Sequence, residues 1–141
     1  MLKACSKIEF METEKKSTHI LLIDDDQLML RVFSSGLVHA GFEVMQAHEG
    51  NEGREMARRL QPDLILLDLH MPMMGGVEVL SHLKDEEPTK NIPVVIFSNE
   101  DLSIEAERNI KELGAVGYIY KSMPMEDIVK YVQAVLGTTS K

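Results

Sequence analysis

Four short hydrophobic runs divide this chain, at residues 20–23, 64–67, 94–97 and 118–120. Nearly uninterrupted apolar runs of this length are typical of parallel strands that are buried on both faces of a sheet. A fifth, weaker strand is predicted over the short segment 43–47, where the pattern is more polar. The hydrophobic pattern therefore predicts a sheet whose central strands are fully covered.

Apolar residues at helical spacing fill the segments between these runs. The pattern predicts helices that open near Asp26, span 49–60 and 76–84, precede Gly114 and begin near Pro124. Strands and helices thus alternate strictly in five βα units. This alternation predicts an α/β fold with a doubly wound, five-stranded parallel sheet, right-handed crossovers and helices on both faces.

Polar residues follow the four hydrophobic runs directly. They are Asp24-Asp25-Asp26, Asp68, Ser98 and Lys121. If the strands are parallel, these side chains emerge at one edge of the sheet, where open α/β folds place their ligand sites. Clustered carboxylates suit Mg²⁺, and a carboxylate can also accept a phosphoryl group. A nearby lysine and hydroxyl would neutralise and position that group.

Each of these signals also has a purely structural interpretation. The acidic run could cap the helix that follows it. A lone Asp68, Ser98 or Lys121 is more often a solvated strand end. The phosphoryl interpretation is favoured because suitable residue types stand at four strand ends of one chain.

Length and charge narrow the class of protein. A chain of 141 residues has room for one domain with a real core. The net charge of -8 argues against a dedicated nucleic-acid surface. No apolar stretch is long enough for a signal peptide or a membrane span, and Cys5 has no cysteine partner, so a cytoplasmic location without membrane insertion is expected.

These residues together resemble the receiver domain of two-component response regulators. The matching stretches are 20–25, 63–68, Met71-Pro72 with Gly76, 94–98 and 114–121. The resemblance covers about residues 18 to 136. It implies a flavodoxin-like sheet with strand order 2-1-3-4-5, in agreement with the pattern. We expect a flexible leader over 1–17, the receiver domain over 18–137 and a frayed end over 138–141.

The resemblance implies specific roles for the acidic residues. Asp68 would be the phosphoacceptor and also a Mg²⁺ ligand. Asp25 would bind Mg²⁺ directly, and Asp24 would act largely through a coordinated water. The backbone carbonyl of His70 would supply another metal ligand. A protein of this kind is not a metabolic enzyme, although it assists its own phosphorylation and dephosphorylation.

The remaining roles concern the response to phosphorylation. By the same resemblance, Lys121 would pair with the acyl phosphate, Ser98 would bind a phosphoryl oxygen, and Tyr118 would change rotamer with it. The implied phosphodonor is a phosphohistidine on a sensor histidine kinase or a phosphotransfer protein. The implied output is a downstream protein target or an attached output domain.

Several positions depart from the usual pattern of the family. Ser122 stands where a proline usually follows the lysine, so we expect a trans Lys121–Ser122 bond. Gly75 stands where an aspartate is common. In the family, the positions held here by His70 and Glu100 tune how long the phosphoryl group persists, which leaves its lifetime open.

Three alternatives to a stand-alone receiver follow from the same residues. The chain could be a receiver fragment of a hybrid kinase or a transcription regulator. A haloacid-dehalogenase-like phosphatase would need a second aspartate two residues after Asp68, where this chain has His70. A flavodoxin-like flavin binder would need a phosphate loop after the first strand, and the acidic run there would repel a phosphate in the absence of a metal.

Overall fold

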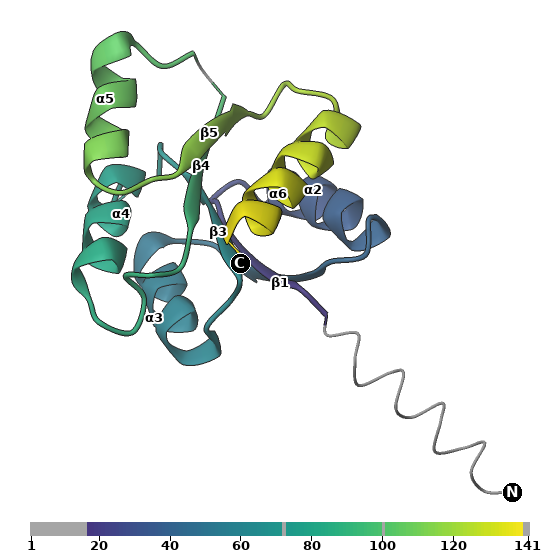
Figure 1. The fold of residues 1–141 in the computed structure, drawn as a ribbon, viewed down its shortest axis with the longest axis horizontal. Helices are drawn as coiled ribbons and strands as arrows, with labels where there is room; N and C mark the ends of the chain where they lie inside the picture. Colours follow the sequence, from purple (N-terminus) through teal and green to yellow (C-terminus); the bar gives the residue numbers. More distant parts are fainter. Residues whose placement is uncertain (1–16, 72, 100, 140–141) are drawn as a thin grey trace, which may run out of the picture.

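The structure, a computed structural model, describes residues 17–71, 73–99 and 101–139. Parallel strands form one sheet in the order β2-β1-β3-β4-β5, which confirms the predicted class and strand order (Figure 1). The strands are β1 (His19–Ile23), β2 (Glu43–Ala47), β3 (Leu64–Asp68), β4 (Val94–Ser98) and β5 (Gly117–Tyr120). The helices are α2 (Gln27–His39), α3 (Gly50–Leu60), α4 (Gly76–Asp85), α5 (Ile104–Glu112) and α6 (Met125–Thr139).

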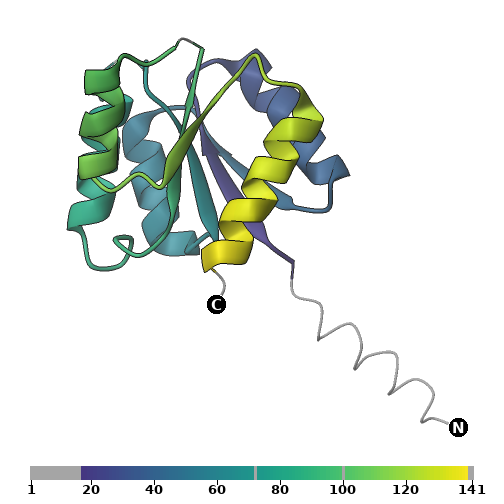
Figure 2. The same cartoon turned by 45° about the horizontal axis from the view of Figure 1, so that its top comes forward.

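The helices cover both faces of the sheet. α3, α4 and α5 lie on one side and α2 and α6 on the other, as Figures 1 and 2 show. Successive strand residues point to opposite faces, so Leu21 and Ile23 pack toward the first group, and Ile20 and Leu22 toward the second. This two-sided burial explains why the strands read as continuous apolar runs rather than as alternating ones.

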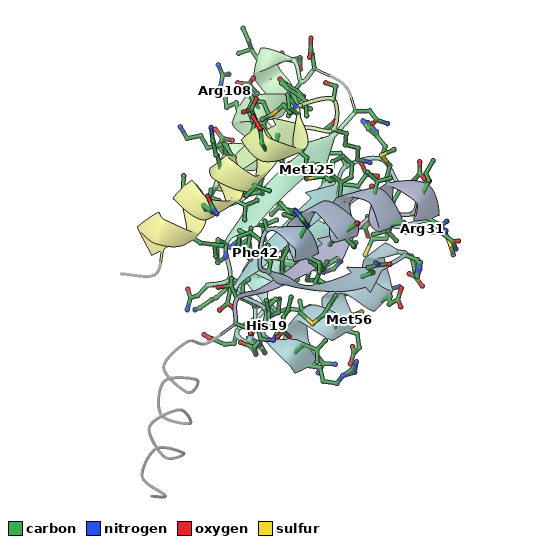
Figure 3. All side chains as sticks on the ribbon, turned by 90° about the vertical axis from the view of Figure 1, so that its right-hand side faces the viewer. His19, Arg31, Phe42, Met56, Arg108 and Met125 are labelled. Atoms are coloured by element: carbon green, nitrogen blue, oxygen red, sulfur yellow. The ribbon has the colours of Figure 1, made fainter. Side chains whose placement is uncertain are left out.

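Helices α2 and α6 contact each other closely as well as the sheet. Met125 stands at the start of α6, as Figure 3 shows. Its side chain fills the space next to Gly36 of α2. A Cβ atom at Gly36 would lie only 2.5 Å from the Met125 Sδ atom. The contact fixes the beginning of α6, directly after the loop that carries Lys121.

The helix boundaries agree with the sequence signals at the start of the chain and differ at its end. Asp26 is the N-cap of α2, and Gly41 follows the end of α2 with a φ of +105°. The last helix runs to Thr139, beyond the Leu136 at which the pattern placed its end. Gly137 does not adopt a positive φ and so continues the helix.

Other predictions concern the chain ends and one peptide bond. Residues 1–16 of the expected leader and residues 140–141 lie outside the described residues. No peptide bond within the described ranges is cis, so the expected trans Lys121–Ser122 bond is confirmed. Across those same ranges, no helix has both the length and the apolar character that crossing a membrane would require.

Candidate functional site

The polar residues singled out in the sequence meet at the carboxyl edge of the sheet. Asp68 and Ser98 are the last residues of β3 and β4, Asp24 directly follows β1, and Lys121 directly follows β5. The strand order brings these ends together, because β1, β3, β4 and β5 are successive neighbours in the sheet. The site therefore arises from the topology and does not require any long loop.

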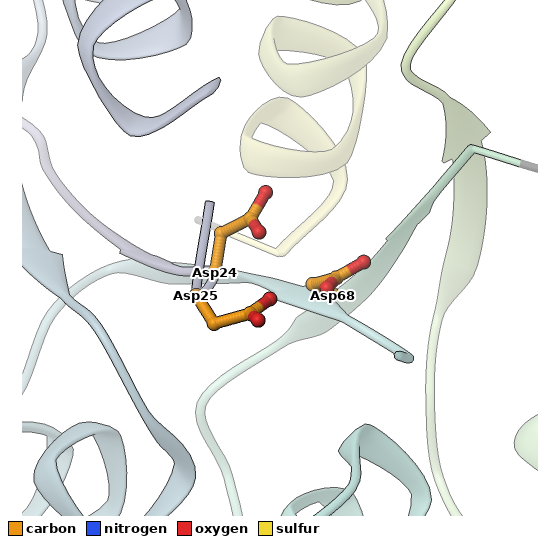
Figure 4. Close-up of side chains that lie close together, drawn as sticks. All are labelled: Asp24, Asp25 and Asp68. Carbon is orange, nitrogen blue, oxygen red and sulfur yellow. The ribbon is translucent and has the colours of Figure 1, made fainter. Parts of the chain in front are cut away.

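Three carboxylates form the centre of the site. Ligand oxygens of Asp24, Asp25 and Asp68 all lie within 4.8 Å of one another (Figure 4). Asp24 and Asp68 are buried, whereas Asp25 is exposed. The cluster thus has two enclosed carboxylates and one that faces solvent, which leaves an open side for a ligand.

Asp26, the third aspartate of the acidic run, has a structural role outside the cluster. The Asp26 carboxylate accepts hydrogen bonds from the backbone N–H groups of Leu28 and Met29, and so caps α2. The Asp26 N–H in turn donates to Asp24 Oδ1 at 3.0 Å, which orients the buried carboxylate. Both interpretations of the acidic run are therefore correct, each for different residues.

Lys121 supplies the positive charge of the site. Its Nζ atom lies 2.6 Å from Asp24 Oδ2 and 3.2 Å from Asp68 Oδ1, and only 6% of its side chain is exposed. Burial opposes the charged form of Lys121, but the hydrogen bonds and charges of the two carboxylates outweigh burial and raise its pKa. The ammonium therefore remains protonated across the physiological range.

The carboxyl group of Asp68 is strongly perturbed by its surroundings. Burial raises its pKa to about 6, and the neighbouring charge of Asp24 adds to the effect. The Lys121 ammonium and a hydrogen bond from the His70 backbone act in the opposite direction without overcoming burial. The carboxylate at this position is therefore incompletely compensated, and additional positive charge would stabilise it.

The two residues predicted to act as a switch, Ser98 and Tyr118, lie on the side of the site toward β5. Ser98 is fully buried, and its backbone carbonyl accepts a hydrogen bond from the Lys121 N–H at 2.8 Å. The Tyr118 hydroxyl donates a hydrogen bond to the Glu107 carboxylate of α5, and the Tyr118 ring packs edge-on against Tyr120. Tyr118 thus points toward α5.

Comparison with known proteins identifies the chain. The sequence profile of the response regulator receiver domain matches residues 20–133. The chain belongs to this family. It is accordingly a receiver domain of two-component signalling, with a fold shared by the chemotaxis regulator CheY and its relatives.

Relatives of similar size carry the same domain. The polar-differentiation response regulator DivK of Brucella ovis is 30% identical over 118 residues, which cover 84% of this chain and 95% of the relative. The structure of chemotaxis protein CheY4 from Vibrio cholerae has a TM-score of 0.80 and 29% identity, covering 85% of this chain and 99% of that one. A CheY-like receiver protein from Methanospirillum hungatei has a TM-score of 0.81 and 25% identity, covering 89% and 98%.

The donor set of the site fits a divalent cation. Its ligands are carboxylate oxygens, which Mg²⁺ prefers. The buried Asp24 Oδ2 is paired with Lys121 and accepts no other hydrogen bond, so it retains capacity for a further partner. The exposed Asp25 faces solvent, as suits a metal that keeps several of its waters. The carbonyl of His70 stays a predicted ligand, while its backbone N–H bonds to Asp68.

Gly76 approaches the candidate phosphoacceptor closely, which its place in the sequence motif does not reveal. A Cβ atom at Gly76 would lie 2.2 Å from the Asp68 carbonyl oxygen and 2.6 Å from Leu69 Cα. Both obstacles are backbone atoms, so they cannot rotate away. The absence of a side chain at Gly76 is therefore part of how the end of β3 is held against α4.

Gly76→Ala is expected to lower the free energy of unfolding by about 1–3 kcal/mol, as for other overpacked sites that force a backbone shift. Urea unfolding would measure this loss. Gly75→Ser is the matched control, because a Cβ at Gly75 meets only the Leu69 carbonyl oxygen at 3.8 Å and serine can cap α4. Equal stability of the two variants would contradict the packing argument.

Proposed function

We propose that this receiver domain accepts a phosphoryl group on Asp68 in a Mg²⁺-dependent reaction. The observation that carries the proposal is the enclosure of Asp68 between the carboxylates of Asp24 and Asp25 and the ammonium of Lys121. A carboxylate so placed is a nucleophile with a cation on one side and a metal-binding pair on the other. The arrangement suits phosphoryl transfer, which depends mainly on position and charge neutralisation.

The proposed transfer uses the residues of the site directly. An Asp68 carboxylate oxygen attacks the phosphorus of a phosphohistidine, a P–O bond forms, and the P–N bond breaks with its electron pair returning to the donor imidazole. Lys121 offsets the charge of the phosphoryl oxygens. Asp24, Asp25, Asp68 and the His70 carbonyl would hold Mg²⁺, which would neutralise the same oxygens. The donor is a sensor histidine kinase or a phosphotransfer protein.

The proposed output is a change in a partner-binding face next to β5. The hydroxyl of Ser98, at the end of β4, would bind a phosphoryl oxygen on Asp68 of the adjacent strand. Tyr118, on the next strand, would then turn from its contact with Glu107 toward the interior. A packed core with two discrete arrangements can convey such a local change to a partner protein or output domain.

The direct test is labelling with a small acyl phosphate. Incubation with acetyl phosphate and Mg²⁺ should place a phosphoryl group on Asp68, located by peptide mapping, and chelation of the metal should prevent it. Asp25→Asn should reduce the labelling rate by at least about tenfold through lost metal binding. Asp26→Asn is the matched control, because Asp26 is also exposed but caps α2 outside the cluster. Labelling at another residue would overturn the proposal.

A second prediction concerns the resting position of Tyr118. The hydrogen bond to Glu107 raises the pKa of the Tyr118 phenol above its ordinary value, and Tyr120 adds to the effect. Glu107→Ala should therefore shift the ionisation of Tyr118 to lower pH. Tyrosinate absorbance would follow the titration, with Tyr118→Phe identifying the transition.

Glu105→Ala provides the control for this titration, because Glu105 is an exposed residue of the same helix that makes no such contact with Tyr118. An unchanged Tyr118 titration in Glu107→Ala would show that the hydrogen bond does not hold the tyrosine in solution.

A further inference from the structure

The side chain of Lys121 crosses a whole strand to reach Asp68. Lys121 follows β5 and Asp68 ends β3, with β4 between them. Adjacent strands lie about 4.8 Å apart, so the lysine spans roughly two strand spacings. The β4 residue directly beside Asp68 in the register is Phe97, which is also the partner of Ile119 on β5. Phe97 therefore lies under the path of the lysine.

Side-chain alternation places the ring and the ammonium on the same face. Phe97 and Ile119 both pack in the cluster beneath α2 and α6, and Lys121 comes two residues after Ile119. The Lys121 Nζ atom lies over the Phe97 ring, 5.4 Å from its centroid. This distance is within the range of a cation–π interaction.

The environment makes this contact stronger than it would be at the surface. Phe97 is fully buried, and the Lys121 side chain is nearly so, which keeps water away from the ammonium. The carboxylates of Asp24 and Asp68 occupy one side of the charge. The electron-rich face of the ring supplies a favourable environment on another side that carboxylates do not fill.

The ring itself is held in place. Phe33 of α2 packs against Phe97 with a centroid separation of 4.6 Å and an angle of 83° between the ring planes. This is the edge-to-face arrangement that aromatic pairs favour. The position of the ammonium is thereby tied to the packing of α2 on the sheet.

We propose that Phe97 is a positioning residue, whose ring face holds the Lys121 ammonium over β4 so that it meets Asp68 and the group bound there. Unlike a hydrogen bond, attraction to a ring face depends weakly on direction. The ammonium can therefore turn from the carboxylate toward a phosphoryl oxygen without leaving the ring. The role of Phe97 in phosphoryl transfer rests on the proposed function, whereas its role in holding the Lys121 ammonium does not.

The competing explanation is that Phe97 only fills the core. Site-specific replacement with a trifluorinated phenylalanine separates the two, because fluorine withdraws electron density from the ring face and changes its shape little. The same replacement at Phe33 is the matched control, since Phe33 lies in the same cluster and contacts the Phe97 ring. Phe97→Leu and Phe33→Leu provide a second pair.

Two measurements on the whole protein test the inference. The first is the exchange rate of the Lys121 ammonium protons with water, followed by NMR at fixed pH without Mg²⁺ or phosphodonor. The second is the rate of labelling by acetyl phosphate at saturating donor, determined separately from the half-saturating concentration. Fluorination at Phe97 should raise the exchange rate and lower the saturating rate, each by about three- to tenfold. Fluorination at Phe33 should change neither by more than about twofold.

The outcomes distinguish this inference from the proposed function. An unchanged ammonium exchange rate in the fluorinated Phe97 protein would overturn the positioning role, whatever the labelling shows. Faster exchange with an unchanged labelling rate would overturn the contribution to transfer. If the parent protein is not labelled at all, the proposed function fails, and the exchange measurement still decides whether the ring positions the ammonium.

Discussion

Asp68→Asn should abolish phosphoryl labelling and, without metal, make the protein more stable at neutral pH. Labelling is lost because an amide is not a nucleophile toward phosphorus under these conditions. Stability increases because the buried carboxylate, beside Asp24, is ionised at an energetic cost that asparagine avoids. We expect the free energy of unfolding at pH 7 to rise by about 1–2 kcal/mol.

The pH dependence of this gain follows from the direction of the pKa shift. Asp68 has a pKa of about 6 in the folded protein, above the value of about 3.9 for an unfolded chain. The folded state therefore binds more protons between these values, and the stability of the parent falls as pH rises from about 4 to about 6. The advantage of Asp68→Asn should be full above this window and absent below it.

Urea unfolding across this pH range measures the effect. Asp63→Asn is the control, because Asp63 is exposed at the opposite edge of the sheet and accepts a hydrogen bond from the His19 N–H that asparagine can also accept. Added Mg²⁺ should stabilise the parent more than Asp68→Asn. Persistent labelling of Asp68→Asn, or a stability equal to the parent at pH 7, would refute the corresponding part of the prediction.

Lys121→Met should cause the largest loss of stability among the site variants. Methionine retains much of the lysine's length but leaves the carboxylates of Asp24 and Asp68 buried without their cation. Removing one partner of a buried ion pair costs several kcal/mol, so we expect a loss of about 3–5 kcal/mol at pH 7. Labelling by acetyl phosphate should fall by at least about a hundredfold, as for a lost group that neutralises transition-state charge.

The pH profile again has a definite sign. Lys121 lowers the pKa of Asp68, so its removal raises that pKa further above the unfolded value. The stability of Lys121→Met should therefore fall as pH rises through the raised pKa, and the difference from the parent should be smallest in acid, where Asp68 is protonated.

The control for this variant is Lys130→Met on the exposed surface of α6. Saturating Mg²⁺ should recover part of the stability lost by Lys121→Met, since a bound cation compensates the same carboxylates. Equal destabilisation by the two lysine substitutions would show that the buried ion pair contributes nothing specific.

The sequence by itself determined the class of fold and the edge at which the site lies. Buried parallel strands must be apolar on both faces, so runs such as 64–67 and 94–97 were recognisable without a structure. Because strands and helices alternate along the chain, the strands are expected to be parallel. The carboxyl ends of parallel strands lie at the same edge of the sheet. Asp68, Ser98 and Lys121 could be grouped for this reason, although they are far apart in the chain.

Only the tertiary structure divided the acidic run between its two roles. Asp24, Asp25 and Asp26 are chemically identical in sequence, and the direction of each side chain depends on how the chain turns from β1 into α2. The structure places Asp24 in the buried ion pair, Asp25 in the cluster at the surface, and Asp26 on the free N–H groups of the helix.

Contacts between side chains on different elements also could not be predicted from the sequence. In the sequence, Phe97 is one of several apolar strand residues and has no distinguishing signal. Its position under Lys121 follows from the register of β3, β4 and β5. The sequence indicates only that Glu107 is a solvated helix residue. The packing of α5 brings its carboxylate to the Tyr118 hydroxyl. Local patterns determine which residues are buried and where elements end, whereas the partner of each side chain depends on distances between elements that only the assembled fold sets.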